Sequence, residues 1–179
     1  GKHDVSVTAT DPAGNVGNDD TVDELQIYRT AYYVNDNSTT GDAWATAVGD
    51  DVNDGLSPAE PKATVQDVLA DYDLEPGDVI RIDTGNYALT SNITVSSADG
   101  GSSAAPVTIE ASPYGVTVDR GSTAYGSYAL NVAAPYVTIQ TANGPLYSSA
   151  PHSWMQITGG YAGVRTSEDH TTVRRVDVH

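Results

Sequence analysis

The sequence contains no cysteine and no phenylalanine among its 179 residues. The absence of cysteine excludes disulfides, zinc–thiolate sites and thiol nucleophiles, so core burial or bound cations must hold the fold together. The HExxH and GxSxG motifs and a glycine-rich phosphate loop are absent as well. Zincin, serine-hydrolase and nucleotide-binding functions are therefore not expected.

Basic residues are scarce: 8 Lys and Arg stand against 24 Asp and Glu, which gives a formal net charge of -16. Nucleic acid is not expected as a partner of such a chain, because its phosphates would be repelled. The acidic residues are concentrated in residues 1–78, where 17 of them accompany only Lys2, Arg29 and Lys62. Adaptation to a salty medium would also produce an acidic surface.

Long apolar runs are missing too, since no stretch approaches the roughly 18 residues that a membrane-spanning helix needs. Membrane insertion is not expected. A charged-then-apolar signal segment is not found either, so an export signal would have to lie upstream. Tyrosine is frequent, with 11 occurrences, and 39% of the residues are apolar. This β-rich composition is typical of secreted or cell-surface proteins.

The clearest pattern lies between residues 31 and 110. AYYV (31–34) predicts a strand, and the acidic loop DDVNDGLSP (50–58) separates it from a short helix, KATVQDVLADY (62–72). Within that helix an apolar stripe recurs at helical spacing, namely Val65, Val68, Leu69 and Tyr72. Thr64 is the expected N-cap, with Asp67 three residues later. Pro76–Gly77 suits a type II turn that leads into the strand VIRID (79–83).

Later strands align with VIRID at intervals of about 30 residues, as stacked parallel coils would. In the alignment, Ile82, Ile109, Ile139 and Val173 share one inward column, and Ile80, Val107, Val137 and Thr171 share another. The outward column between them contains Arg81, Thr108, Thr138 and Thr172. A second set of strands is expected before these, with Leu130 and Val132 matched to Ala162 and Val164, and to Ile93 and Val95.

The order YYVNDN, NDGLSPAEPKATVQDVL, EPGDVIRIDTGNY resembles the N-terminal cap and first coil of secreted right-handed parallel β-helix proteins of the pectate-lyase-like superfamily. The resemblance covers roughly residues 31–179. It implies an all-β fold dominated by a right-handed parallel β-helix with an N-terminal cap helix. Members include polysaccharide lyases, epimerases and hydrolases, and also adhesins and stalk proteins, so the resemblance implies a fold more than a function.

Residues 1–30 do not follow this pattern. VSVTATD, the turn PAGN and the later strand VDELQIYR (22–29) predict an antiparallel β-hairpin. The phrase VTATDPAGNVG resembles the last strands of a bacterial immunoglobulin-like repeat. We therefore expect three units: the hairpin of an Ig-like module (1–30), the cap with its helix (31–78) and about four β-helix coils (79–179), with the open last coil continued or covered by a neighbouring chain.

The acidic loop is a candidate calcium site, with Asp50, Asp51, Asn53 and Asp54 as ligands, because Ca²⁺ prefers oxygen ligands on a glycine-containing loop. It does not match an EF-hand, since the glycine falls at position 5 rather than 6 when the count starts at Asp51. The alternative is a turn at Asp54–Gly55, in which Asn53 and Asp54 bond to neighbouring backbone groups.

The outward column after the threonines places Asp83 and Glu110 on adjacent strands, followed by Gln140 and Arg174. Two stacked carboxylates about 4.8 Å apart repel each other and require a cation, a shared proton or an arginine. In pectate-lyase-like enzymes, carboxylates on an outward sheet face hold Ca²⁺ against the uronate while a basic residue removes a proton. Asp83, Glu110 and Arg174 are therefore the catalytic candidates, with solvated surface carboxylates as the alternative.

Tyr147, His152 and Trp154 share one loop and are candidates for carbohydrate binding, because Trp can stack on a pyranose face. Trp154 could instead fill a corner of the fold. Glu168, Asp169 and His170, with Arg174 and Arg175, form a possible acid–base group, although a polar turn between strands is favoured.

Taken together, these patterns favour a structural, carbohydrate-facing segment of a large secreted or cell-surface protein, such as an adhesin, stalk or filament component. The alternative is the N-terminal part of a polysaccharide lyase or epimerase that acts on uronic-acid polymers. The expected partners are a polysaccharide or a neighbouring protein chain stacked on the open solenoid end, and Ca²⁺ is the one cofactor considered.

Overall fold

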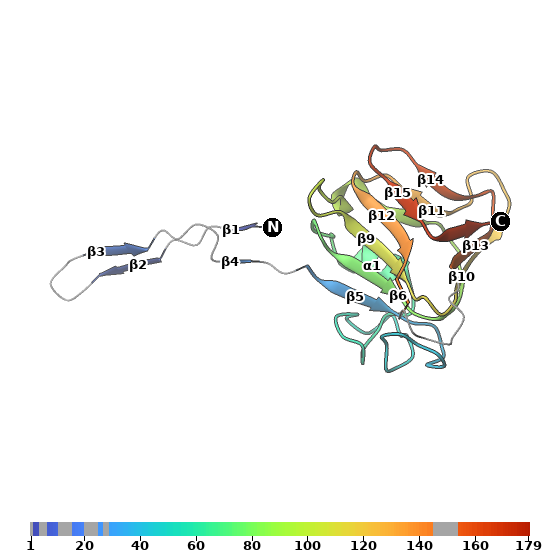
Figure 1. Ribbon diagram of the computed structural model, residues 1–179, viewed down its shortest axis with the longest axis horizontal. Coiled ribbons are helices and arrows are strands. Elements are labelled where there is room, and N and C mark those ends of the chain that lie inside the picture. Colours follow the sequence, from blue (N-terminus) through green and yellow to red (C-terminus); the bar gives the residue numbers. More distant parts are fainter. Residues whose placement is uncertain (1, 4–6, 11–15, 20–24, 27–28, 145–153) are drawn as a thin grey trace.

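The computed structural model describes residues 2–3, 7–10, 16–19, 25–26, 29–144 and 154–179, and these form a mostly β structure (Figure 1). Its main part consists of three sheets in which every strand pairs in parallel. The all-β class and the parallel pairing expected from the sequence are thus confirmed.

The largest sheet has five strands, in the spatial order β15 (Thr172–Arg174), β12 (Val137–Thr141), β9 (Val107–Ala111), β6 (Val79–Ile82) and β5 (Ala31–Val34). The second has four: β16 (Val176–Val178), β13 (Met155–Gly160), β10 (Val116–Ser122) and β7 (Gly85–Ala88). The third has three: β14 (Ala162–Thr166), β11 (Tyr128–Val132) and β8 (Ile93–Val95).

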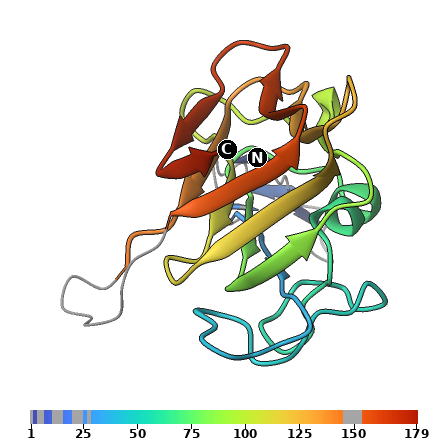
Figure 2. The same cartoon turned by 90° about the vertical axis from the view of Figure 1, so that its right-hand side faces the viewer.

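The chain visits these sheets in a fixed order. From β6 onward it contributes one strand to the five-stranded sheet, one to the four-stranded sheet and one to the three-stranded sheet, and then returns to the first. We call each such passage a repeat. Figure 2 shows strands of successive repeats lying side by side.

The core consists of aliphatic side chains stacked from repeat to repeat. Ile80, Ile109 and Ile139 occupy paired positions on β6, β9 and β12 and are 0% exposed. Ile93 and Leu130 form an equivalent stack between β8 and β11. Because parallel neighbours place like side chains above one another, each repeat buries the apolar side chains of the one before it.

The predicted helix is present as α1 (Val65–Asp71), and its cap is the predicted one, since the Thr64 hydroxyl accepts a hydrogen bond from the Asp67 backbone N–H. Val65 and Val68 are buried, and the helix packs against β6 and β8. The turn that follows has the predicted geometry. Gly77 has a φ of 99°, which favours glycine, and the Asp78 N–H donates to the Glu75 carbonyl.

The register of the first strand differs from the prediction. The columns through Ile109, Ile139 and Val173 and through Thr108, Thr138 and Thr172 are confirmed. On β6, however, Ile80 rather than Ile82 pairs with Ile109, so Arg81 pairs with Glu110. The predicted match of Leu130 with Ala162 is wrong in the same way, because Leu130 pairs with Val164.

The four-stranded sheet was not predicted from the sequence as a separate layer. β7 overlaps TGNY (84–87), which predicts a tight turn through its glycine and asparagine, and β13 begins at Met155, directly after the loop residue Trp154. β7 is short and contains Gly85 and Asn86, so its sequence lacks the alternating apolar pattern of a recognisable strand.

The N-terminal residues contain two short antiparallel pairs. β2 (Val7–Thr10) pairs with β3 (Val16–Asp19), and β1 (Lys2–His3) pairs with β4 (Leu25–Gln26). The predicted pairing of residues 5–11 with residues 22–29 is therefore wrong, because β2 pairs with β3, which is nearer in the sequence. Pairing with a segment nearer in the sequence costs less loop-closure entropy.

A short 3₁₀ helix (Ser97–Asp99) follows β8 and is fixed by a reciprocal cap between Ser96 and Asp99. No helix within the part of the chain that the structure describes is long and apolar enough to cross a membrane.

The stacked core predicts that the stability lost on substitution by Asp depends strongly on the position within one column. Replacing Ile139 by Asp should cost about 4 kcal/mol or more, because the charge would lie unpaired in a fully buried site. The matched control is Val173→Asp, at the next position of the same column but 43% exposed, which should cost much less. Chemical denaturation of both variants tests this, and equal losses would contradict the stacked register.

Candidate functional site

The outer face of the five-stranded sheet carries one polar column that crosses all its strands. The register aligns Tyr33 on β5 with Arg81, Arg81 with Glu110, Glu110 with Gln140, and Gln140 with Arg174. We call these five residues the outer ladder. It contains Glu110 and Arg174, two of the catalytic candidates, and it gains Arg81 in place of the expected Asp83.

Neighbouring side chains of the outer ladder are joined by three hydrogen bonds and one longer ion pair. Gln140 Nε2 donates to Glu110 Oε1 at 2.8 Å, and Arg174 Nε donates to Gln140 Oε1 at 2.6 Å. Arg81 Nε lies 3.9 Å from Glu110 Oε2, and Arg81 Nη1 donates to the Tyr33 hydroxyl at 3.4 Å. The expected repulsion between stacked carboxylates does not arise, because arginine and amide groups stand on either side of Glu110.

Asp83 lies apart from this column and has a structural role. It is 1% exposed, and its carboxylate accepts hydrogen bonds from the backbone N–H groups of Ala43, Trp44, Ala45 and Thr84, at 2.6 to 2.8 Å. The predicted Asp83–Glu110 pair is therefore wrong. The Asp83 carboxylate holds the 43–45 loop against the end of β6.

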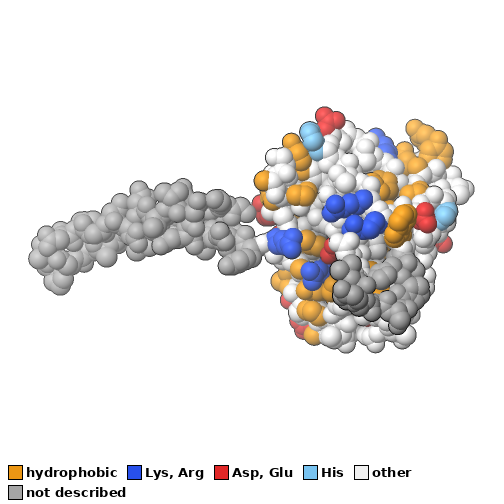
Figure 3. Space-filling model, viewed as in Figure 1, with side chains coloured by type: hydrophobic (Ala, Val, Ile, Leu, Met, Phe, Trp, Pro, Cys, Tyr) orange, Lys and Arg blue, Asp and Glu red, His pale blue; other side chains and the backbone are white. Residues whose placement is uncertain are grey.

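Arg81 lies between two aromatic rings at the start of the outer ladder. Its guanidinium carbon is 5.8 Å from the centroid of the Tyr33 ring and 5.3 Å from that of Trp44, distances at which cation–π attraction is favourable. Figure 3 shows Lys and Arg side chains grouped in the middle of the face on which β9, β12 and β15 lie. This face is locally cationic in a chain of net charge -16.

A hollow of about 340 Å³ adjoins the outer ladder. Its walls combine aromatic and polar groups: Ala43, Trp44, Glu110, Pro113, Tyr114, Ala142 and Asn143. It could receive one or two sugar rings, with Trp44 and Tyr114 offering apolar surface and Glu110 and Asn143 offering hydrogen bonds. This hollow was not predicted from the sequence, because Trp44 and Tyr114 belong to loops far apart in the chain.

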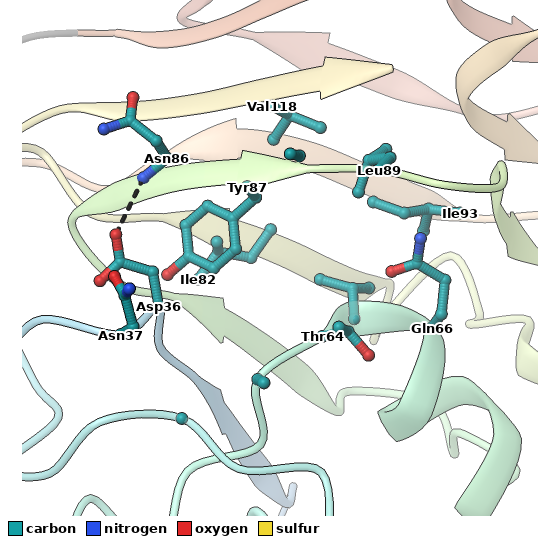
Figure 4. A pocket seen from close by; sticks show the side chains of 14 residues that line it. Asp36, Asn37, Thr64, Gln66, Ile82, Asn86, Tyr87, Leu89, Ile93 and Val118 are labelled. Atoms are coloured by element: carbon teal, nitrogen blue, oxygen red, sulfur yellow. Dashed lines mark hydrogen bonds between the residues drawn. The ribbon is translucent and has the colours of Figure 1, made fainter. Parts of the chain in front are cut away.

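A second cavity, of about 270 Å³, lies between the start of α1 and β7 (Figure 4). Buried Ile82, Tyr87 and Val118 form much of its apolar wall. At its polar end Asp36 accepts a hydrogen bond from the Asn86 N–H at 3.1 Å, and the Tyr87 hydroxyl donates to the Asp83 carbonyl at 2.9 Å. The cavity offers space, but these polar groups already bond within the protein.

In the acidic loop, the predicted calcium ligands make local hydrogen bonds. Asp50 accepts from the Val52 N–H, and Asp51 accepts from the N–H groups of Ala63 and Thr64. Asp54 accepts from the Leu56 N–H, while the Asn53 amide donates to the Pro61 carbonyl. These contacts agree with the alternative of a hydrogen-bonded turn. Among the described residues no group of three or more His, Cys, Asp or Glu is arranged to hold a metal, and calcium binding stays a prediction.

An internal cation lies beside this loop. Lys62 is 1% exposed, and its Nζ lies 2.7 Å from Asp71 Oδ2, 3.0 Å from Asp67 Oδ2 and 3.0 Å from the Asp51 carbonyl oxygen. Burial alone would lower the pKa of Lys62, but hydrogen bonds to Asp71 and Asp67 outweigh it, and the pKa is raised. Lys62 thus connects the acidic loop, through the Asp51 carbonyl, to α1, through ion pairs with Asp67 and Asp71.

Of the predicted carbohydrate-binding loop, Tyr147 and His152 lie outside the described residues. Trp154, just before β13, is 52% exposed. Of the possible acid–base group, His170 stacks on Tyr136 with ring centroids 4.4 Å apart. His170 adopts a φ of 65°, so it occupies a turn between β14 and β15. Glu168 and Asp169 are exposed in the same turn, as the polar-turn alternative describes.

The chain matches no family model, no curated protein and no solved structure. The resemblance to pectate-lyase-like proteins and to Ig-like repeats therefore stays a prediction.

Asp42 provides a test of the electrostatics around Asp83. One of its oxygens accepts from Asn35 Nδ2 at 2.7 Å, while the other is buried without a partner. Burial, aided by the charges of Asp83 and Asp36, raises the pKa of Asp42 above its usual value near 3.8. The folded state thus holds this proton more tightly than the unfolded state, and stability is lost as the pH rises through the folded-state pKa.

Asp42→Asn should therefore raise the melting temperature at pH 7 and give no gain at pH 3, where wild-type Asp42 is protonated. The matched control is Asp73→Asn, an exposed carboxylate that should change the melting temperature little at either pH. An equal rise in melting temperature at both pH values would contradict a raised pKa of Asp42.

Proposed function

We propose that the chain is a structural, carbohydrate-facing segment of a secreted or cell-surface β-helix protein. In this proposal the three parallel sheets wind as a right-handed β-helix, with α1 and the acidic loop as its cap and the N-terminal strands as part of an Ig-like module. The single observation that carries the proposal is the outer ladder, in which three of the four neighbouring pairs are hydrogen-bonded and the fourth, Arg81–Glu110, is an ion pair at 3.9 Å.

That pairing favours a structural role over catalysis. A general base must be free to take a proton from the substrate. Glu110 Oε1 instead accepts a hydrogen bond from Gln140, Glu110 Oε2 lies 3.9 Å from Arg81 Nε, and Arg174 is bound to Gln140. The same ladder holds neighbouring strands together on the outer face, as a stalk or filament segment requires.

The carbohydrate contact in this proposal is the hollow beside Trp44 and Tyr114. It adjoins Arg81, and Arg174 and Arg175 lie farther along the same sheet. An acidic polysaccharide would meet aromatic surface and positive charge there.

A neighbouring chain that stacks on the last repeat remains the proposed protein partner. Val173 and Val178 there are 43% and 49% exposed, although the equivalent Ile139 and Ile157 one repeat earlier are buried. A further layer of strands would cover them and pair the strand edges.

Affinity electrophoresis in gels that contain alginate, pectin or a glycosaminoglycan tests the function. We expect retardation of the wild type by at least one of these polymers, reduced by Trp44→Ala but not by Val52→Ala, a control at an exposed apolar residue of the acidic loop. We also expect no unsaturated product in solution. A rise in near-ultraviolet absorbance that is lost in Glu110→Gln would overturn the proposal in favour of a polysaccharide lyase.

A further inference from the structure

Three tyrosines lie close together on the three-stranded sheet: Tyr128 begins β11, Tyr125 precedes it, and Tyr161 precedes β14. Tyr125 is 86% exposed and Tyr161 is 54% exposed. Their ring centroids lie 5.3 Å apart at an interplanar angle of 69°, and Tyr128 lies 6.4 Å from Tyr161 in a similar edge-to-face arrangement. We call these three residues the tyrosine platform.

Hydrogen bonds with Asn92 hold the backbone of the platform in place. Asn92 Oδ1 accepts hydrogen bonds from the Tyr128 backbone N–H at 3.1 Å and from Arg120 Nε at 2.9 Å. Asn92 Nδ2 donates to the Gly126 carbonyl at 3.0 Å, which ties down the loop that carries Tyr125. The tyrosines therefore project from a fixed backbone, and less conformational entropy is lost when a ligand binds.

Polar groups adjoin the rings on the outer face of the three-stranded sheet. The Arg165 guanidinium lies 5.6 Å from the Tyr128 centroid, and its Nη1 donates to Asn131 Oδ1 at 2.7 Å. Thr94 pairs with Asn131 on the next strand, and both Thr94 and Arg165 are exposed. A guanidinium has five N–H donors, so Arg165 keeps donors for a ligand beyond the one bound to Asn131.

Exposed aromatic rings beside planar hydrogen-bonding groups match the surface of a pyranose, which has apolar C–H faces and hydroxyl edges. The local charge of the platform favours a neutral glycan. Its two arginines, Arg120 and Arg165, already bond to Asn92 and Asn131, and the arginines of the outer ladder lie on another sheet. In a chain of net charge -16, a surface without a cluster of free basic groups attracts a polyanion poorly, whereas a neutral polymer is not repelled. The same argument disfavours single-stranded nucleic acid, the other polymer that stacks on tyrosine and arginine.

We propose that the tyrosine platform, with Arg165, Asn131 and Thr94, is a binding surface for a neutral glycan built of hexopyranose rings. One or two rings stack on Tyr125 and Tyr161, and their hydroxyls accept hydrogen bonds from Arg165. This surface lies on a different sheet from the outer ladder, so it does not depend on the function proposed for that ladder.

Isothermal titration of the 179-residue chain with cellohexaose, maltohexaose and mannohexaose tests the proposal. We expect at least one of them to bind, and the double variant Tyr125→Ala/Tyr161→Ala to raise its Kd at least about tenfold. Tyr125→Trp should retain binding, because a larger ring offers the same stacking face. Val52→Ala, at an exposed apolar residue of the acidic loop, is the control and should leave the Kd unchanged.

Because both replaced side chains are largely exposed, the double variant should melt close to the wild type, and its melting curve is recorded alongside. Failure of the wild type to bind any of the three oligosaccharides would overturn the proposal, as would an unchanged Kd in the double variant. Binding of oligo(dT) that requires the same tyrosines, without oligosaccharide binding, would assign the platform to single-stranded nucleic acid instead.

Discussion

Parallel pairing of successive repeats in a fixed register is the constraint on which the rest of the structure depends. It places Ile80, Ile109 and Ile139 above one another in the core. Because side chains alternate between the two faces of a strand, the same register also fixes the order of the outer ladder. Core burial and the outward chemistry therefore cannot change independently.

A second constraint acts at the cap, where the acidic residues are concentrated. Carboxylates there accept hydrogen bonds from backbone amides, as Asp83 does for the 43–45 loop and Asp51 does for residues 63 and 64. Lys62 supplies a buried positive charge between Asp67 and Asp71. The abundance of acidic residues in the first half of the chain thus has a structural explanation for several of its members, without a bound metal.

The parts of the fold that could be predicted from the sequence are those in which local chemistry decides the conformation. Thr64 caps α1, Gly77 allows the turn, and the aliphatic alternation of residues 107–111 and 137–141 specifies strands with one buried face. These signals depend on neighbours within a few residues, so they are readable without the tertiary structure.

The register of β6 could not be predicted in this way, because Ile80 and Ile82 are both aliphatic. A shift by two residues keeps every side chain on its own face, so the alternating pattern does not distinguish the two alignments. Long-range contacts do: Asp83 bonds to amides about 40 residues earlier in the chain, and Arg81 fits between Tyr33 and Trp44. The candidate site depended on this register, and Asp83 was assigned to it wrongly for that reason.

The tyrosine platform could not be predicted from the sequence either, because it too depends on long-range contacts. Tyr125, Tyr128 and Tyr161 are spread over two repeats, and no spacing in the sequence marks them as neighbours. They meet only because β11 and β14 pair in parallel, with Tyr128 opposite Ala162.

The register can be measured directly by nuclear Overhauser contacts between backbone protons of β6 and β9 in isotope-labelled protein. Our account predicts contacts that place Arg81 beside Glu110 and Ile80 beside Ile109. Contacts that place Asp83 beside Glu110 and Ile82 beside Ile109 would contradict it, because Arg81 would then leave the outer ladder and the two carboxylates would be adjacent.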